Sequence, residues 1–373
     1  MKIGFMIPYF YPTIGGAENN CYYTARELAK KHEVHVFCSS NENKEETISG
    51  IHVHRCKEVF RIKYYFAFYP SITKKLIQQN LDVLHVHGLG FLQHDRAISQ
   101  LRKKNPKIKI ICTPHGPFMA LKKYNIFGQI FKTLYLPFIK NNARSYNAII
   151  AVNPSQKKWM GQDYGIQKEK IHFIPNGINK ESFNKAPAKK EFSNKFVISY
   201  LGRIQEYKGL DQVIQSLPEM KKINNKILFI MMGDNVGDKK RLQELAEKLN
   251  VEENILFTGR VSEKDKLSIL DASEIFVFPS EWEAFGIATL EAMARKNAVV
   301  SSKTEGGIFL IEEEKNGFLF NYGKPKELET QLIRLLKDKK LLRKIQQNNL
   351  KKSKEFLWTK IASQLENLYS SLI

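Results

Sequence analysis

The sequence predicts an α/β protein built from two doubly wound domains that face each other across a cleft. Short apolar segments alternate with helical patterns, a rhythm typical of βαβ units whose parallel sheet is covered by helices. This rhythm runs through the N-terminal half and then starts again, and a chain of 373 residues suits two domains better than one core. In the first half we expect strands at Ile3–Ile7, Val34–Cys38, Val83–Val86, Ile108–Cys112 and Ala148–Val152, and a helix at Ala17–Lys31.

A polar, Lys-rich stretch separates the two rounds of this pattern. We expect residues 179–194 to be a linker between a first domain at 1–178 and a second domain at 195–355. In the second domain we expect strands at Phe196–Leu201, Ile227–Met231, Ile255–Phe257, Ile275–Phe278 and Ala298–Ser301, with helices near Gly209–Leu217, Lys239–Leu249, Lys264–Ala272 and Ala288–Arg295.

Composition narrows the class of protein. The hydrophobic content of 43% is ample for globular domains, and no run approaches the ~18 apolar residues of a membrane span. The apolar part of Met1–Pro8 is too short for a secretory signal, and we expect it to form a first strand. The four cysteines show no CxxC spacing, so a reducing cytoplasm is the simplest location.

The net charge of +21 is concentrated in the first domain. Residues 1–178 hold 26 Lys and Arg against 11 Asp and Glu, which is +15. An anionic membrane surface, an acidic substrate, nucleic acid or a general Lys bias would each explain the excess. Because no nucleic-acid-binding motif accompanies it, we expect no nucleic acid partner.

The segment Ser280–Ala294 carries two informative carboxylates. It follows a short apolar run that we expect to be a strand ended by Pro279. Glu283 then lies on a loop at the carboxyl end of that strand, and Glu291 lies in the helix after Gly286. Ligands of open α/β sheets bind at this edge, where a helix N-terminus favours an anion. A phosphorylated ligand with hydroxyls for both carboxylates fits the segment; two ordinary surface carboxylates fit it as well.

Two cations follow the first strand of the second domain. Arg203 and Lys208 lie between Gly202 and Gly209, where they could neutralise a diphosphate. The glycine spacing is not that of a Walker loop and no GxGxxG follows a strand, which weakens ATPase and dinucleotide oxidoreductase interpretations. Taken alone, the pair could equally be two of the 59 Lys and Arg.

The first domain offers a glycine pair and histidines. Gly15 and Gly16 join the first strand to the first helix and would let backbone amides approach an anion, although a plain turn uses the same residues. His115 could hydrogen-bond a sugar hydroxyl or transfer a proton, although most single histidines do neither. We assign His85 and His87 to opposite faces of their strand and find no zinc or Asp-x-Asp spacing, so we expect no protein-bound metal.

In their order along the chain, these motifs resemble glycosyltransferase family 4. The resemblance spans nearly the whole chain and rests on Gly15-Gly16, Pro175-Asn176-Gly177, Gly202-Arg203, Lys208-Gly209, Glu283 and Glu291 around Phe285-Gly286, and Gly306-Gly307. It implies the GT-B fold and a retaining, metal-independent transfer of a hexose from a nucleotide-sugar, with no cofactor. It also implies that the last helix, about 356–373 and beginning near Phe356-Leu357-Trp358, crosses back onto the N-terminal domain.

The resemblance implies how the donor diphosphate is bound. Arg203 and Lys208 would contact it and stabilise the charge that develops as it leaves, a role worth roughly 3–4 kcal/mol per donor group. Because the family places no carboxylate nucleophile on the reacting face, the leaving phosphate oxygen would take the acceptor proton in a front-face transfer. Backbone at Gly15, Gly16, Phe285 and Gly286 would assist.

Other implied contacts concern the nucleoside and the sugar. Glu291 would bind the ribose hydroxyls and Glu283 would orient the transferred sugar, with His115 beside it. Arg260 and Val261 belong to a loop that would hold the base mainly through its main chain. We thus expect catalytic roles for His115, Arg203, Lys208 and Glu283.

One position departs from the family pattern. The family often has an acidic residue three positions after its Gly-Gly pair, where this chain has Leu310. Leu310 cannot make the contact near the donor that the acidic residue of the family would make, whereas the diphosphate and ribose contacts do not depend on this position. A non-catalytic nucleotide-sugar-binding subunit, and a phosphorylase, hydrolase or epimerase on the same fold, stand as alternatives.

The acceptor would meet the basic first domain. Lys63–Tyr69 and Ile126–Ile139 combine aromatic residues with sparse cations, which suits an interfacial helix or a groove for a lipid tail. Core packing of an ordinary helix is the alternative. We expect a glycan or lipid-linked acceptor and a cytoplasmic protein that could lie peripherally on the inner face of the cell membrane. The sugar and the choice of UDP or GDP are not specified by these motifs.

Overall fold

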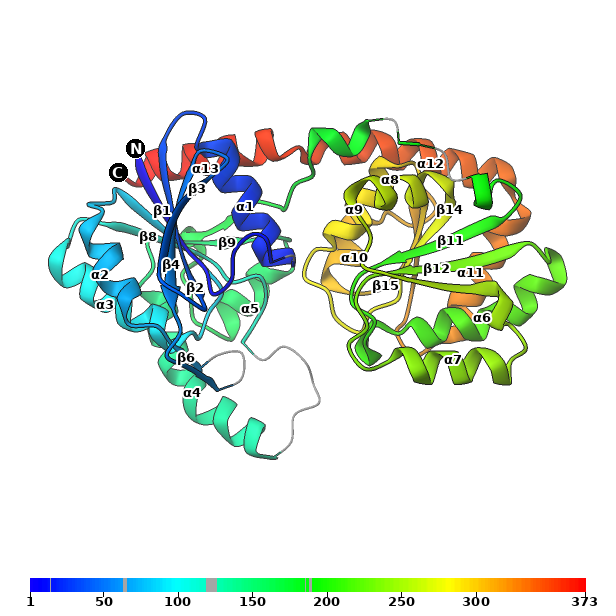
Figure 1. Cartoon of the computed structure of the whole chain (residues 1–373), viewed down its shortest axis with the longest axis horizontal. Coiled ribbons are helices and arrows are strands. Elements are labelled where there is room, and N and C mark those ends of the chain that lie inside the picture. Colours follow the sequence, from blue (N-terminus) through cyan, green and yellow to red (C-terminus); the bar gives the residue numbers. More distant parts are fainter. Residues whose placement is uncertain (14, 63–65, 119–125, 185, 188–189) are drawn as a thin grey trace. The chain divides into compact units, whose positions relative to one another are not determined.

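The computed structural model describes residues 1–373 except 14, 63–65, 119–125, 185 and 188–189. It divides into two compact units, one formed by Met1–Gly177 with Trp358–Ile373 and the other by Ile178–Leu357 (Figure 1). The stretch 179–194 is part of the second unit and contains two short 3₁₀ turns, η2 (Lys180–Phe183) and η3 (Lys190–Phe192).

The first unit is organised around an eight-stranded sheet in the order β10-β9-β8-β7-β1-β2-β4-β3. Its strands pair in parallel, except that β3 and β4 form an antiparallel hairpin. The central strands are buried along most of their length, as a sheet covered on both faces requires. The strands are β1 (Lys2–Met6), β2 (Glu33–Ser40), β3 (Lys44–Ile48), β4 (Ile51–Lys57), β7 (Val83–His87), β8 (Lys109–Thr113), β9 (Ala148–Ala151) and β10 (Ile171–Phe173), with a separate hairpin of β5 (Phe60–Ile62) and β6 (Phe66–Phe68).

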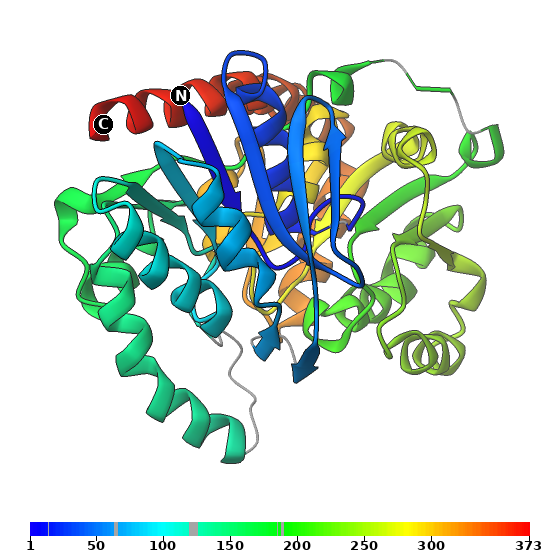
Figure 2. The ribbon, with the colours of Figure 1, turned by 60° about the vertical axis from the view of Figure 1, so that its left-hand side comes forward.

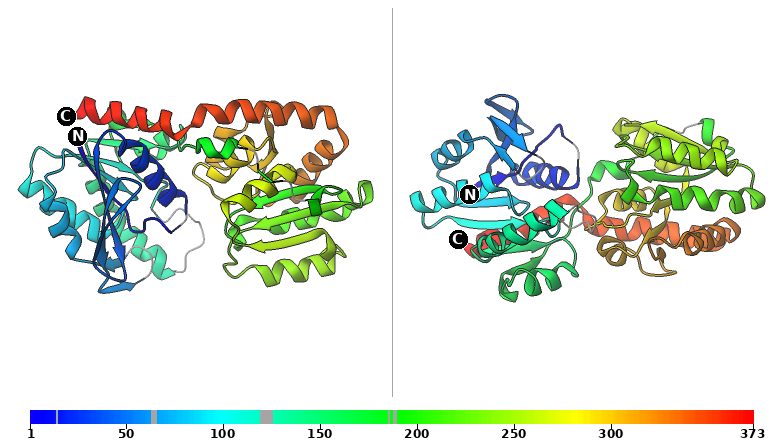
Figure 3. Two further views of the ribbon diagram at one scale, coloured as in Figure 1. Left: turned by 45° about the horizontal axis from the view of Figure 1, so that its top comes forward. Right: turned by 90° about the horizontal axis from the view of Figure 1, so that it is seen from below.

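Helices cover both faces of this sheet, because alternate strand residues belong to two separate cores. Phe5 of β1 packs in a cluster with α1 (Gly16–Leu28) and α13 (Trp358–Leu372), whereas Met6 packs in the other cluster. The last helix lies beside α1, where Tyr23 stacks on Trp358 with ring centroids 5.8 Å apart (Figure 3). The other helices are α2 (Ser71–Gln78), α3 (Leu92–Lys104), α4 (Ile126–Arg144) and α5 (Gln156–Gln162).

Among the described residues, helix α4 (Figure 2) has one side that is buried and one that is exposed. Ile139 and Ala143 are buried in the first unit, but Phe127 and Leu134 are 76% and 75% exposed. The two alternatives raised by the sequence, core packing and an open apolar face, therefore apply to opposite sides of the same helix. Of the other aromatic stretch, residues 63–65 lie outside the described part of the chain.

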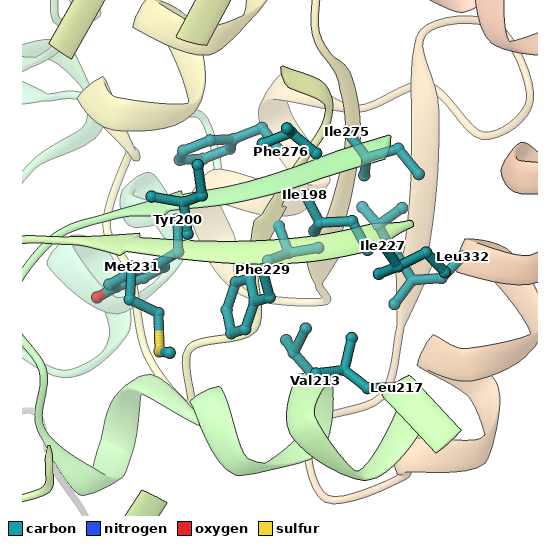
Figure 4. Close-up of a cluster of buried hydrophobic side chains, with 14 of the residues drawn as sticks. Ile198, Tyr200, Val213, Leu217, Ile227, Phe229, Met231, Ile275, Phe276 and Leu332 are labelled. Atoms are coloured by element: carbon teal, nitrogen blue, oxygen red, sulfur yellow. The ribbon is translucent and has the colours of Figure 1, made fainter. Parts of the chain in front are cut away.

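The second unit contains a six-stranded, fully parallel sheet in the order β13-β12-β11-β14-β15-β16. Its core lies between these strands and the flanking helices, with Phe229 and Ile198 among the fully buried side chains (Figure 4). The strands are β11 (Phe196–Leu201), β12 (Ile227–Met232), β13 (Ile255–Gly259), β14 (Ser273–Phe278), β15 (Ala298–Ser302) and β16 (Gly317–Phe320).

No helix was predicted at Glu305–Leu310, Pro325–Lys337 or Lys339–Ser353, where the structure has one. Of the four helices that were predicted for this unit, three begin and end within two residues of the predicted bounds. The exception is α6, which runs from Leu210 to Ile223 and passes through Pro218, where the sequence indicated an end at Leu217. Leu217 and Met220 are both fully buried, so the apolar face continues past the proline. The helices are α6 (Leu210–Ile223), α7 (Lys239–Lys248), α8 (Glu263–Ala272), α9 (Ile287–Ala294), α10 (Glu305–Leu310), α11 (Pro325–Lys337) and α12 (Lys339–Ser353).

Candidate active site

Loops at the carboxyl ends of β11, β12 and β13 meet at one edge of the second unit. The amide of Gly233 donates to the carbonyl oxygen of Gly259 at 2.9 Å. A Cβ atom at Gly233 would lie 2.0 Å from the carbonyl oxygen of Gly202, so only glycine allows this approach. This is the edge at which parallel α/β sheets bind ligands.

Lys208 and Glu283 come together at this edge. A 3₁₀ turn, η4 (Glu206–Lys208), follows β11 and leaves Lys208 only 7% exposed. Its Nζ donates to Oε2 of Glu283 at 3.2 Å and lies over the rings of Tyr207 and Phe278, 4.8 and 5.1 Å from their centroids. The carboxylate and the two ring faces hold the ammonium group in place.

Arg203 lies on the same loop and is exposed. Its Nη2 donates to the hydroxyl of Tyr207 at 3.0 Å, and its carbonyl oxygen accepts from the hydroxyl of Tyr200 at 2.9 Å. One hydrogen bond thus holds the guanidinium group and the other holds the backbone of Arg203, while the side chain stays accessible to a ligand. The loop presents two cations at the strand end, which suits a diphosphate.

The loop from Glu283 to Gly286 is held by the glycine pair of α10. The amide of Gly306 donates to the carbonyl oxygen of Glu283 at 3.0 Å, and a Cβ atom at Gly306 would lie 2.4 Å from the carbonyl oxygen of Phe285. Gly286, with φ +88°, caps the N-terminus of α9. Phe285 is 1% exposed and its ring packs on Phe309, so it offers a ligand its backbone alone.

Glu291 of α9 is paired with Lys266 of α8. Lys266 Nζ lies 2.7 Å from Glu291 Oε1, and also contacts Glu263. Lys266 is 8% exposed; burial by itself would lower its pKa, but the carboxylates of Glu291 and Glu263 outweigh it and raise the pKa well above the usual value. Lys266 was not predicted as a site residue, although its spacing from Ile269 places it on the apolar side of the helix.

The loop after β13 lies at the same edge. Arg260 is exposed and forms an ion pair with Asp234, its Nε 3.2 Å from Oδ2. The guanidinium group lowers the pKa of the Asp234 carboxyl by hydrogen bonding. Val261 is half-buried and packs against the core. The side chains of this loop are occupied within the protein, which leaves its main chain for a ligand.

The glycine pair and His115 lie in the first unit. Gly15 caps α1, and a Cβ atom at Gly16 would meet nothing within 4 Å among the described residues. His115 follows β8 with φ +62°, a backbone conformation that is uncommon outside glycine. Its Nε2 lies 2.8 Å from Nδ1 of His87, and burial lowers the pKa of His115 to about 4. His115 is therefore neutral at pH 7.

Two family profiles match consecutive parts of the chain. "Glycosyltransferase Family 4" matches residues 14–182, and "Glycosyl transferases group 1" matches residues 182–352. The chain belongs to glycosyltransferase family 4. The matched ranges contain all the loops described above.

Relatives of this glycosyltransferase span its whole length. It is similar to the gpi3 subunit of phosphatidylinositol N-acetylglucosaminyltransferase from Schizosaccharomyces pombe (24% identity, 98% of this chain, 79% of the relative) and to phosphatidyl-myo-inositol mannosyltransferase from Mycobacterium leprae (23% identity, 100% of this chain, 97% of the relative). Among solved structures it is similar to sucrose-phosphate synthase from Thermosynechococcus elongatus (TM-score 0.82, 18% identity, 100% of this chain, 98% of that one) and to Anabaena HepE in complex with UDP and glucose (TM-score 0.78, 20% identity, 100% of both chains). These likenesses show the GT-B fold.

The assignment of His85 and His87 to opposite faces of β7 is wrong. Side chains two positions apart on a strand share a face, and these two rings stack with centroids 4.7 Å apart. His85 is hydrogen-bonded to the hydroxyls of Tyr369 and Thr113, at 2.6 and 2.7 Å. Even so, the described residues include no group of three or more His, Cys, Asp or Glu that could hold a metal ion.

The departure at Leu310 has a packing explanation in this family member. Leu310 is 0% exposed at the end of α10, and its carbonyl oxygen accepts from Nδ2 of Asn316 at 3.0 Å. The apolar side chain is thus part of the second unit's core. It leaves the Lys208–Glu283 and Glu291–Lys266 pairs intact.

Proposed function

We propose that this protein is a retaining hexosyltransferase that takes its sugar from a UDP- or GDP-sugar. The observation that carries the proposal is the buried ammonium group of Lys208 beside Glu283 at the carboxyl edge of β11. A cation fixed at that edge suits a diphosphate leaving group, and a carboxylate next to it suits the hydroxyls of the transferred sugar. Solved neighbours with UDP, and with UDP-glucose, support the nucleotide-sugar donor.

Within this proposal each side chain has one task. Lys208 and Arg203 neutralise the diphosphate, Glu283 orients the sugar and Glu291 binds the ribose hydroxyls. The main chain around Arg260 and Val261 holds the base. Backbone at Phe285 and Gly286 assists in binding the diphosphate. For the first unit, we propose that backbone at Gly15 and Gly16 binds an anionic group of the donor and that His115 hydrogen-bonds a sugar hydroxyl.

The proposed chemistry is a front-face transfer without a metal. The bond from the anomeric carbon to the diphosphate breaks as the acceptor oxygen attacks from the same side, and the leaving phosphate oxygen takes the acceptor proton. Charge on the departing diphosphate is stabilised by Lys208 and Arg203. Turnover should be unchanged by EDTA; loss of activity restored by a divalent cation would contradict this part of the proposal.

A panel of nucleotide-sugars in a thermal-shift assay tests the donor. A specific donor at 100 times its dissociation constant should stabilise the folded protein by about 2.7 kcal/mol. Lys208→Met should abolish that shift, whereas Lys240→Met, on the exposed side of α7, should not change it. If no UDP- or GDP-sugar shifts the wild-type protein, the proposal fails. Release of free sugar at full rate without an acceptor would indicate a hydrolase instead.

For the acceptor we propose a lipid-linked molecule, reached with the protein on an anionic membrane. Helix α4 exposes five large apolar side chains and carries no acidic residue. Between Asp95 and Asp163 the chain has 13 Lys and Arg and no Asp or Glu. An apolar helix face in a stretch of sequence that carries only basic charges matches an anionic interface.

Two relatives named above act on phosphatidylinositol by their names. Among the described residues, no helix combines the length and apolarity needed to cross a bilayer.

Sedimentation with vesicles tests this surface. Wild-type protein should bind phosphatidylcholine vesicles that contain phosphatidylglycerol, and binding should weaken at high salt. Phe127→Ser with Leu134→Ser should reduce binding by about tenfold or more, since each loses apolar burial in the interface. The matched control, Ile223→Ser with Leu256→Ser, changes exposed apolar residues of the second unit and should bind like wild type. Wild-type protein that stays unbound would contradict membrane attachment.

A further inference from the structure

His115, the residue proposed to contact the sugar, is the last member of a stack of three histidines in the first unit. The rings of His85 and His87 are 4.7 Å apart, and those of His87 and His115 are 5.1 Å apart. His85 and His87 are each 1% exposed, whereas His115 is only partly buried. His115 is thus the one member of this stack that can reach a ligand.

All three imidazoles are neutral at physiological pH. Burial lowers the pKa of His85 to about 3 and that of His115 to about 4. Burial, with the neighbouring imidazoles of His85 and His115 as the next causes, also holds the pKa of His87 well below its usual value. Each ring therefore carries one proton, and the tautomer decides which nitrogen donates.

The contact between His87 and His115 allows two arrangements of protons. Nδ1 of His87 and Nε2 of His115 are 2.8 Å apart, so one of them carries a proton and the other accepts it. If His115 donated, His87 would have to carry its own proton on Nε2. That atom is buried and has no hydrogen-bond partner among the described residues.

The arrangement in which His87 donates to His115 is the favoured one. In native structures a buried N–H without an acceptor is rarer than a buried acceptor without a donor. His87 therefore carries its proton on Nδ1 and donates to Nε2 of His115. Nε2 of His115 is then an acceptor, and the proton of His115 is on Nδ1. This Nδ1 has no partner among the described residues and, unlike Nε2 of His87, is not a buried atom.

We propose that His87 is a positioning residue that fixes His115 in the Nδ1-protonated tautomer, so that His115 presents an N–H donor to a hydroxyl oxygen of the transferred sugar. The left-handed backbone at His115 and the stacked ring of His87 define the direction of that donor. His115 then binds and orients the sugar and takes up no proton. This inference rests on the proposed function, because only that function puts a sugar beside His115.

The tautomer can be measured without substrate. In protein labelled with ¹⁵N-histidine, long-range ¹H–¹⁵N correlation spectra distinguish the two tautomers of each ring, and His115→Ala identifies the signals of His115. Wild-type protein should show a protonated Nδ1 and an unprotonated Nε2 at His115. A protonated Nε2 at His115 would overturn the inference whatever the activity.

Two substitutions of His87 test its role. His87→Asn keeps an N–H near the position of Nδ1, and His87→Phe keeps the ring stack but removes the donor. We expect that in His87→Phe the His115 ring populates both tautomers and that kcat falls by about tenfold. His87→Asn should keep the Nδ1-protonated tautomer of His115 and a kcat close to that of wild type. Equal spectra and equal kcat in wild type and His87→Phe would refute the positioning role.

The two proposals fail separately. If His115→Ala turns over normally while the wild-type spectrum shows the Nδ1 tautomer, the sugar contact is wrong and the fixed tautomer stands. If the spectrum shows the other tautomer while donor binding is normal, the proposed function stands and the role of His87 falls. Should His87→Phe not fold, the wild-type spectrum and His87→Asn decide the question.

Discussion

The ammonium group of Lys208 donates a 3.2 Å hydrogen bond to Oε2 of Glu283 and so joins the loop after β11 to the loop after β14. The two residues are 75 positions apart in the sequence. Their contact puts the cation that we propose to bind the diphosphate and the carboxylate that we propose to orient the sugar at one edge of the sheet. It also means that removal of either partner changes the environment of the other.

Lys208→Ala should lower turnover by roughly a hundredfold or more, because it removes a fixed positive charge where the leaving diphosphate gains negative charge. Initial-rate measurements with saturating donor check this. Lys221→Ala is a matched control, since Lys221 lies at the exposed end of α6 and contacts only the carbonyl oxygen of Asn250 in the described structure. Turnover of Lys208→Ala close to wild type would remove Lys208 from the mechanism.

Glu291→Ala should weaken donor binding by about tenfold to a hundredfold, the effect of losing hydrogen bonds to a charged group. Turnover at saturating donor should change much less, because the ribose is remote from the reacting bond. Calorimetric titration with the nucleoside diphosphate alone measures the affinity. If that affinity is unchanged, Glu291 serves the Lys266 pair only.

Lys266→Met should destabilise the second unit by about 1–3 kcal/mol, less than a fully buried pair, since Glu291 and Glu263 retain some solvent contact. Urea unfolding gives the value, with Lys264→Met on the exposed side of the same helix as control. A Lys266→Met protein as stable as wild type would show that the pair is energetically neutral.

Gly209→Ala should cost more stability than Gly323→Ala, although both glycines have a left-handed backbone. Gly209 has φ +64° and a Cβ atom there would lie 2.3 Å from the carbonyl oxygen of Pro279; Gly323 has φ +80° with nothing within 4 Å. The second substitution measures the backbone cost, about 1 kcal/mol. The difference measures the contact between the loops after β11 and β14. Equal effects would indicate that these loops can separate without cost.

Stability should fall as the pH drops from about 6.5 towards 4. The pKa values of His115 and His85 are lowered to about 4 and about 3 by burial, so below 6.5 the unfolded chain binds protons that the folded protein does not. Each histidine then costs about 1.4 kcal/mol per pH unit until its folded pKa is reached. Urea unfolding at pH 7 and pH 5 checks the slope. His85→Gln should flatten that slope, and an unchanged slope would contradict the buried neutral state.

Some of the fold follows directly from local sequence. The strand Phe196–Leu201 was predicted with the bounds that the structure has, and β14 ends at Phe278 because Pro279 cannot continue it. Apolar periodicity and breaker residues act over a few positions, so a single sequence is enough to read them. The loop positions of Arg203 and Glu283 follow from the same signals.

Other elements of the fold cannot be predicted from such local signals. The hairpin of β3 and β4 was missed because Lys44–Ile48 is a polar edge strand with little burial, although Ser49 and Gly50 both have positive φ, as a tight hairpin turn requires. Helix α6 continues through Pro218 since the helices packed around it bury Met220. In both cases tertiary packing outweighs local propensity.

By itself the sequence determined the two α/β units, the strand-end position of each motif and, through their order, the family. Only the tertiary structure decided which side chains are partners. Glu291 meets Lys266 across 25 positions, His115 meets His87 across 28, and Tyr369 of α13 reaches His85 across 284. Such contacts depend on which helix packs on which strand and at what register, and residue spacing along the chain does not contain that information.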